Sequence, residues 1–253
     1  MSTHFVGDTT VLLCRSMRHI TRSLDTIITV TIMPIALMLL FVYVLGGAID
    51  VGSAQYVNYL LPGILLITIV MGISYTAFRL FTDVNSGMFE RLQSMPISRP
   101  SVLWAQVLAS VVSNLLSLVL VMLVALLIGF RSSAGIWDWL AVVAILILFT
   151  VATTWIAVIA GLSARTVDGV GALAYPFLFL LFISSAFVPT DTMPAVVRAF
   201  ADNQPVTSII NTIRDLLAQQ STGADVWIAL AWCVGILVVA YTLATAAYRR
   251  KRG

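Results

Sequence analysis

Long stretches without a charged residue constrain this chain more than any other feature of its sequence. Six windows contain no Asp, Glu, Lys or Arg, with lengths of 24, 28, 31, 26, 22 and 23 residues: 26–49, 51–78, 100–130, 139–164, 169–190 and 226–248. A helix of about 20 apolar residues crosses the roughly 30 Å hydrocarbon core of a bilayer. Each window is long enough for one crossing and too short for two, so the sequence predicts six transmembrane helices.

The composition excludes a soluble fold. Charged residues make up 10% of the chain, against roughly 25% in an average soluble domain, and the mean hydropathy is +1.03. A membrane β-barrel would show alternating segments of about 10 residues, whereas Leu115–Leu127 is apolar on both faces. We therefore expect an all-α, polytopic membrane protein with a single transmembrane domain over 1–253.

Basic residues predict the orientation in the membrane. With the N-terminus in the cytoplasm, 11 Lys and Arg residues fall in inner segments and 3 in outer segments, which satisfies the positive-inside rule. Both termini are then cytoplasmic, and the protein lies in the bacterial plasma membrane. The basic balance reflects this topology and does not indicate nucleic-acid binding; the cluster 249–252 would instead anchor the last helix to anionic lipid.

The expected elements follow from these windows and from amphipathic patterns between them. Leu13, Met17, Ile20 and Leu24 form one stripe, which predicts an interfacial helix over 9–25. The outer segment, about 191–224, predicts short helices that either dip into the outer leaflet or cap the bundle. The predicted spans are about 26–49, 57–78, 102–130, 139–164, 169–190 and 226–248.

The cytoplasmic stretch between the second and third spans has the most varied chemistry. It contains Glu90, the only glutamate of the chain, next to Arg91. Apolar side chains at 84, 88, 92 and 95 share one face, so a short amphipathic helix over about 83–95 is expected, ending before Pro96.

Missing residue types exclude several kinds of chemistry. The only lysine, Lys251, is followed by Arg252, so the chain has no nucleotide-binding P-loop. Both histidines, His4 and His19, precede the first span, which excludes a serine-protease triad or a HExxH zinc site in the bundle. We expect no catalytic residue, metal or cofactor in this chain, and any ATP hydrolysis would occur on another polypeptide.

The spans also lack the ionisable groups that proton-coupled transporters place at membrane depth. Sodium coupling through carbonyl and hydroxyl groups, or a channel, stays possible, and so does a scaffold that transports nothing. The polar face of the third span contains Ser110, Asn114 and Ser117, at spacings of four and three residues. It is interpreted first as helix packing through hydrogen bonds and second as the lining of a pathway for an amphipathic substrate.

Several segments resemble one known family in order along the chain. They are Gly87–Arg99 with the following Val102-Leu103, Pro34 in the first span, Leu61-Pro62-Gly63 in the second, and Gln204–Thr207 with Arg214. Together they resemble ABC-2-type ABC exporter permeases, in particular the daunorubicin/doxorubicin-resistance permeases. Gln204 departs from the asparagine that is frequent there.

The resemblance implies a function and partners. The helix at about 83–95 would dock on a separate ATPase subunit through a set of coupling residues: Gly87, Met88, Glu90, Arg91 and Pro96. Two permeases, identical or related, would assemble with two ATPases that bind ATP and Mg²⁺, and export hydrophobic or amphipathic compounds. The alternative is an ATP-independent secondary transporter or channel.

Overall fold

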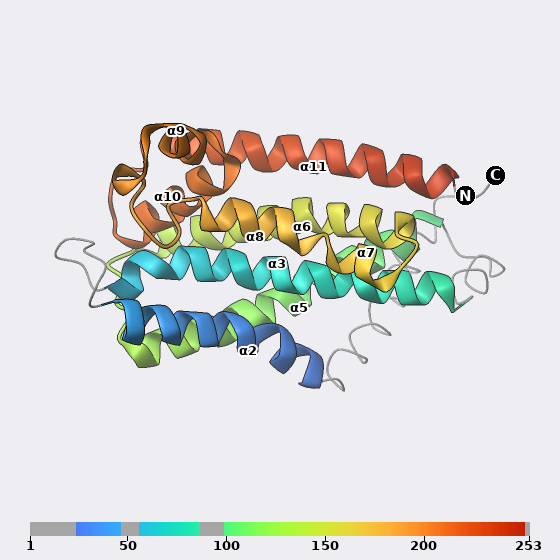
Figure 1. Cartoon of the computed structure of the whole chain (residues 1–253), viewed down its shortest axis with the longest axis horizontal. Helices are drawn as coiled ribbons and strands as arrows, with labels where there is room; N and C mark the ends of the chain where they lie inside the picture. Colours follow the sequence, from blue (N-terminus) through green and yellow to red (C-terminus); the bar gives the residue numbers. More distant parts are fainter. Residues whose placement is uncertain (1–23, 47–55, 87–98, 251–253) are drawn as a thin grey trace.

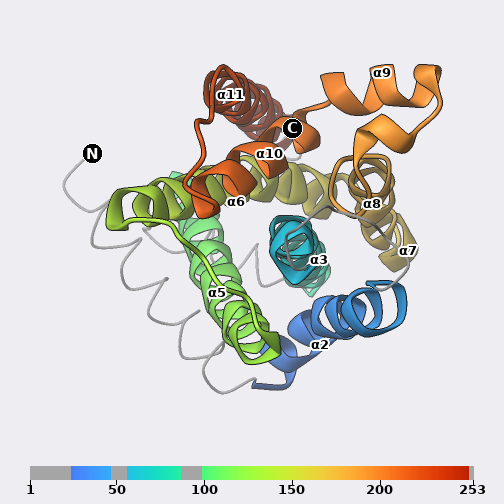
Figure 2. The same cartoon turned by 90° about the vertical axis from the view of Figure 1, so that its left-hand side faces the viewer.

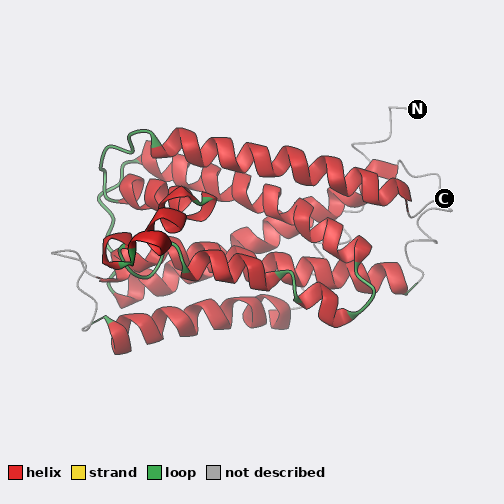
Figure 3. Ribbon diagram, turned by 45° about the horizontal axis from the view of Figure 1, so that its top comes forward, coloured by secondary structure: helices red, strands yellow, loops and turns green. Residues whose placement is uncertain are grey.

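The computed structural model describes residues 24–46, 56–86 and 99–250, and this part of the chain is helical without a strand (Figure 3). The predicted all-α, polytopic class is therefore confirmed. The helices are α2 (Leu24–Leu40), the π-helix η1 (Phe41–Leu45), α3 (Tyr56–Asn85), α5 (Arg99–Ile128), α6 (Ile136–Ser163), α7 (Val167–Gly171), α8 (Ala174–Phe182), the 3-10 helix η2 (Thr190–Thr192), α9 (Ala195–Asn203), α10 (Pro205–Leu217) and α11 (Asp225–Arg250).

The long helices form an up-and-down bundle (Figure 1). α2, α5 and the α7–α8 pair run one way, and α3, α6 and α11 run back. The end where α3 stops and α5 starts is called the loop end, and the opposite end, which holds α9 and α10, is called the α10 end. α11 ends at the loop end, and α2 begins on the side of the bundle toward that end, short of where α3 stops (Figure 1).

α3 is the central helix (Figure 2) and packs against α2, α5, α6, α8 and α10. Its residues from Leu60 to Val70 are all buried, because an apolar helix with neighbours on every side has no face left for lipid. α11 packs on α6 and α10 at the edge of the bundle. Large exposed apolar residues on the outward faces of α5 and α11, such as Leu123 and Val238, are suited to lipid.

Within the described residues, four helices are long and apolar enough to cross a membrane: α3, α5 from Leu103, α6 and α11 up to Tyr248. α3 extends beyond its predicted end at residue 78, because Leu80 is buried in a cluster with Trp155 and Leu162. Residues 83–85 therefore continue α3 and do not start a separate helix. The predicted interfacial helix 9–25 lies outside the described residues except for its last two, which belong to α2.

The other two predicted spans are shorter apolar segments, 30–44 and 167–182. The fifth, expected as one helix over 169–190, is divided into α7 and α8 and ends at Phe182. Residues 183–187 form turns, since the Ser184 hydroxyl donates to the Leu181 carbonyl (2.6 Å) and accepts from the Ala186 amide (3.1 Å). Such local side-chain bonds compete with helix continuation.

The predicted short helices of the outer segment are confirmed as α9 and α10, and they differ in burial. One face of α10 is fully covered, with Ile209, Ile210 and Ile213 each at 0% exposure, so α10 caps the bundle. α9 packs on α10 and η2, and its Val196 is 85% exposed. Arg198 of α9 forms exposed ion pairs with Asp191 and Asp202.

Candidate functional site

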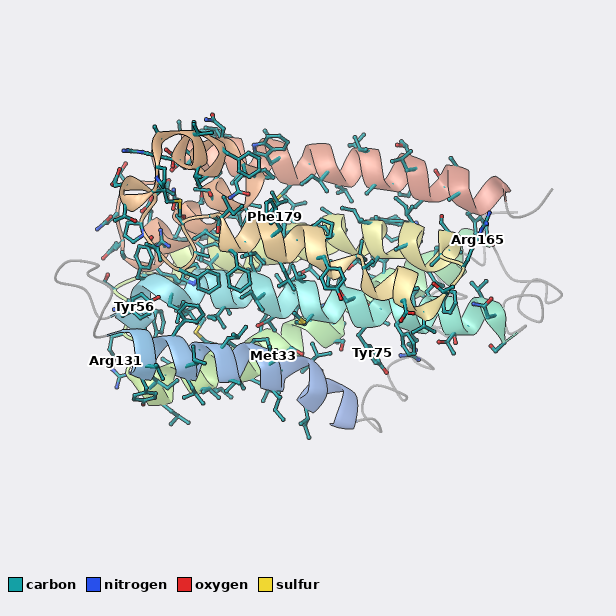
Figure 4. All side chains as sticks on the ribbon, viewed as in Figure 1. Met33, Tyr56, Tyr75, Arg131, Arg165 and Phe179 are labelled. Carbon is teal, nitrogen blue, oxygen red and sulfur yellow. The ribbon has the colours of Figure 1, made fainter. Side chains whose placement is uncertain are left out.

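The residues predicted to couple the chain to an ATPase, Gly87, Met88, Glu90, Arg91 and Pro96, lie outside the described residues. Their two neighbouring helices are described, and α3 and α5 pack against each other. In Figure 4, Arg165 marks the loop end, while Arg131 and Tyr56 mark the α10 end. The segment that joins α3 to α5 thus leaves and re-enters the bundle at the loop end.

Ser110, Asn114 and Ser117 all face the interior of the bundle, with exposures of 4%, 1% and 1%. Ser110 meets Thr76 of α3 and Thr154 of α6, and Asn114 donates to Ser110; these four residues are called the polar layer. The Ser110 Oγ lies 2.8 Å from the Thr76 Oγ1 and 3.4 Å from the Thr154 Oγ1. In this conformation the face packs three helices together, and its role as a pathway lining stays a prediction.

The number of hydroxyl protons limits how strongly the polar layer joins these helices. Thr76 donates its only proton to the Gly72 carbonyl (3.0 Å), and Thr154 donates its own to the Thr150 carbonyl (2.6 Å). Ser110 therefore has to donate to Thr76, and no proton is left for a full bond to Thr154. One good hydrogen bond between helices remains, which contributes about 0.6 kcal/mol.

Asn114 contains an acceptor that no donor in the described part of the chain reaches. Its Nδ2 donates to the Ser110 carbonyl (3.0 Å), but its Oδ1 is buried without a hydrogen-bond partner among the described residues. A Cβ built on Gly72 would overlap this Oδ1. The missing side chain of Gly72 therefore leaves the space between α3 and α5 that the Asn114 amide occupies.

A second polar region lies at the α10 end, where the turns after α8 are buried. Ser184, Ser185, Ala186 and Phe187 are each at most 4% exposed. Irregular backbone inside an apolar protein needs partners for its carbonyl groups. Two side chains supply them: the Tyr56 hydroxyl donates to the Phe187 carbonyl (2.9 Å), and Arg214 Nη2 donates to the Ser185 carbonyl (2.7 Å).

Arg214 of α10 binds two other elements, α3 and the turns, as well as a residue of its own helix. Besides Ser185, its Nε and Nη2 donate to the Tyr59 carbonyl (3.4 and 3.3 Å), and its Nη1 donates to the Asn211 Oδ1 (3.0 Å). The same Asn211 oxygen accepts a bond from the Ser185 hydroxyl (2.7 Å). The guanidinium carbon also lies 3.8 Å from the centre of the Tyr59 ring, a cation–π contact.

The five residues Tyr56, Tyr59, Ser185, Asn211 and Arg214 are called the Arg214 node. Burial lowers the pKa of the Arg214 guanidinium, and the nearby Asp215 acts in the opposite direction. An arginine still stays protonated, so the node contains a cation. Its hydrogen-bond partners are neutral, because none of the described carboxylates forms an ion pair with it.

Sequence reasoning assigned Arg214 to the outer segment but did not predict these partners. They come from α3 and from the turns after α8, and no periodic pattern connects such distant positions. The sequence alone shows Gly63 only as part of the motif Leu61-Pro62-Gly63. The structure gives it a reason, since a Cβ at Gly63 would lie 2.7 Å from Ala186 Cβ and 3.2 Å from the Ala186 carbonyl oxygen.

Comparison with known proteins decides the family. The model of a family described as ABC-2 type transporter matches residues 8–218. The chain belongs to this family. The match includes the predicted coupling residues, both polar regions and α10, and it confirms the resemblance inferred from the sequence.

Similar proteins include named permeases. The chain is 30% identical over 226 residues to the daunorubicin resistance ABC transporter permease protein DrrB1 of Streptomyces coeruleorubidus, which covers 89% of this chain and 80% of that protein. It is 25% identical over 250 residues to the probable doxorubicin resistance ABC transporter permease protein DrrC of Mycobacterium tuberculosis, covering 97% and 90%. The putative transport permease ycf38 of Cyanophora paradoxa is 25% identical over 221 residues, covering 86% and 76%.

This ABC-2 chain is accordingly a multi-pass membrane permease. Permease subunits of ABC transporters are non-catalytic, and family membership implies an ATPase subunit as partner.

Proposed function

We propose that this chain is the permease subunit of an ATP-driven exporter that moves hydrophobic or amphipathic compounds, such as drugs, lipids or natural products, out of the cytoplasm. The observation that carries the proposal is the family match over residues 8–218, which includes the segment between α3 and α5. The names of DrrB1 and DrrC, resistance permeases for daunorubicin and doxorubicin, support a cargo of this class.

The driving force would come from a separate ATPase that docks on residues 83–95. The only glutamate of the chain, Glu90, and the adjacent Arg91 would supply polar contacts. The surrounding helices favour this site. Because α3 is the central helix, a force that the ATPase exerts on α3 at the loop end would act directly on the core of the bundle. ATP and Mg²⁺ would bind to the ATPase and not to this chain.

The loop end would face the cytoplasm. The end of α3, the start of α5 and the end of α11 share this end (Figure 1), and the basic residues concentrate in the segments predicted to be cytoplasmic. A cysteine introduced by Ser86→Cys should then react with a membrane-impermeant maleimide only in inverted vesicles, and one introduced by Ser221→Cys only in intact cells. The reverse pattern would place the predicted coupling segment outside and end the proposal.

Two permease copies, or this chain and a related one, would assemble with two ATPases, and the cargo would move between the permeases. The lipid-suited faces of α5 and α11 fit a complex that stays embedded in the bilayer. Purification in a mild detergent should therefore recover the permease with an ATPase in equal numbers.

Charge reversal at the coupling segment tests the function directly. Inverted vesicles that contain both subunits should take up daunorubicin in an ATP-dependent manner. Glu90→Lys or Arg91→Glu should reduce this uptake about tenfold, by loss of a polar contact with the partner, while the permease still inserts in the membrane. Asp202→Asn, an exposed charge change at the opposite end, is the matched control. Uptake that needs no ATPase would instead support the secondary transporter or channel.

A further inference from the structure

We infer that Arg214 is a positioning residue, which fastens α10 and the turns at 183–187 to the start of α3, so that the α10 end follows α3 when α3 moves. The part of this inference that concerns motion rests on the proposed function. The fastening itself rests only on the contacts of the Arg214 node.

The first step is the number of elements that one side chain joins. The guanidinium of α10 bonds to the Tyr59 carbonyl of α3 and to the Ser185 carbonyl of the turns. These carbonyls are 155 and 29 residues away in the chain. Arg214 therefore bonds α10 to both elements, and Asn211 of α10 adds one further bond to the turns, accepted from the Ser185 hydroxyl.

The second step is the kind of bond. Hydrogen bonds from a charged donor are roughly twice as strong as neutral ones, and the planar guanidinium can serve Tyr59, Ser185 and Asn211 together while stacking on the Tyr59 ring. A lysine has the charge but not this planar fork. The node thus depends on the shape of arginine and not on its charge alone.

The third step is the position of the node on α3. Twenty-six residues separate Tyr59 from Asn85, which corresponds to about 39 Å of helix at 1.5 Å per residue. A helix is stiff along its axis, so α3 spans from the node to the segment where the ATPase is proposed to dock. If the loop end of α3 were displaced, Arg214 would transmit the movement to α10. Without the bonds of Arg214, α10 would not follow α3.

A labelling experiment on the permease alone, in lipid nanodiscs, tests the fastening. The reporter is Ser208→Cys, at a buried position of α10 (6% exposed), in a background with Cys14→Ser and Cys233→Ala. Arg214→Gln should increase its rate of reaction with an impermeant maleimide about tenfold, because the charge-assisted bonds are lost. Arg214→Lys should behave like Arg214→Gln. Arg198→Gln, a neighbouring exposed arginine, should leave the rate unchanged.

A reporter that reacts at the same rate with and without Arg214 would show that the apolar face of α10 holds it in place, and would overturn the inference. Rescue by Arg214→Lys would show that charge alone suffices and would overturn the role of the fork. Should Arg214→Gln not fold, Asn211→Ala removes one acceptor of the node while the arginine stays, and a rise of a few-fold is expected.

The second arm adds the co-purified ATPase, Mg²⁺ and a non-hydrolysable ATP analogue. In a chain with Arg214, the nucleotide should change the labelling rate both at Ser208→Cys and at Asn85→Cys, at the loop end of α3. In Arg214→Lys the response should persist at residue 85 and vanish at residue 208. A response that persists at both positions contradicts transmission through Arg214. If the nucleotide changes the labelling rate at neither position in a chain with Arg214, the proposed function is contradicted. The labelling rates measured without nucleotide still test whether Arg214 fastens α10.

Discussion

The polar layer and the Arg214 node both lie along α3, but they differ in what they bond. In the polar layer, each threonine hydroxyl donates its hydrogen bond to a carbonyl of its own helix, four residues earlier in the chain. In the node, Tyr56 and Arg214 donate to backbone of other elements, 131 and 155 residues away. The polar layer therefore adds neutral contacts to helices that are already satisfied, whereas Arg214 and Tyr56 satisfy the carbonyl groups of Ser185 and Phe187, which lie in turns.

This difference predicts unequal costs of disruption. A neutral contact between helices in a membrane protein contributes about 0.6 kcal/mol, while leaving a buried backbone group without its partner costs about 1–3 kcal/mol. The two glycines of α3 show the same contrast. Gly63 faces backbone of the turns at Ala186, which cannot move away, and Gly72 faces the end of one side chain, Asn114.

The largest effect is expected at Gly63. Gly63→Ala should lower the free energy of unfolding by about 2 kcal/mol, because the new methyl group would overpack against Ala186. Titration with SDS in mixed micelles measures this change. Gly235→Ala is the matched control, since nothing lies within 4 Å of a Cβ there, and alanine should be neutral or slightly favourable in α11. Equal results for the two variants would refute the close contact.

A smaller loss of stability is expected at Gly72, and a second substitution at Asn114 should remove it. Gly72→Ala should cost about 1.5 kcal/mol by displacing Asn114, as measured by the same titration. The double variant Gly72→Ala/Asn114→Ala removes the clashing oxygen, so its stability should equal that of Asn114→Ala alone. Strictly additive losses would show that α3 and α5 do not approach at this position.

The sequence predicts the polar face of α5, which supplies two residues of the polar layer, better than the node, for a physical reason. Ser110, Asn114 and Ser117 recur with the period of a helix, so their shared face is visible within eight residues of chain. The lengths of the charge-free windows likewise predict helices of membrane length, and the structure confirms this for α3, α5, α6 and α11. Both inferences need only local periodicity and hydrophobicity.

The node and the division of the fifth segment depend on information that is not periodic. Ser184 and Ser185, followed by Pro189, are a local signal for turns that hydrophobicity concealed, because the whole window is free of charge. The partners of Arg214 are set by the tertiary packing of α3, α8 and α10. The coupling residues, in contrast, stay predictions from the resemblance, since Gly87 to Pro96 lie outside the described residues.

A matched pair of hydroxyl deletions compares the two regions directly. Tyr56→Phe removes the donor to the Phe187 carbonyl and should cost about 1 kcal/mol. Ser110→Ala removes the donor to the Thr76 hydroxyl and should cost about 0.6 kcal/mol, since Thr76 still bonds within α3. Both values come from unfolding in mixed micelles. A larger loss at Ser110 than at Tyr56 would reverse the proposed difference between the regions.

The smallest effect concerns the pH dependence of the node. Burial raises the pKa of the Asp215 carboxyl above its ordinary value, opposed by Arg214 and reinforced by Asp225. The folded state therefore holds this proton more tightly than the unfolded state. Its stabilising contribution is complete below the ordinary pKa of about 4 and is lost as the pH rises through the raised value.

Asp215→Asn, which resembles the protonated form, should flatten the pH profile of stability above about pH 4. Arg214→Lys keeps a positive charge near Asp215 and should leave most of the slope in place, whereas Arg214→Gln removes the opposing cation and should steepen it. Unfolding midpoints measured across this pH range separate the three variants. A slope that Arg214→Gln leaves unchanged would mean that Asp215 does not sense the cation of the node, and the electrostatic contrast with the neutral polar layer would then have to be abandoned.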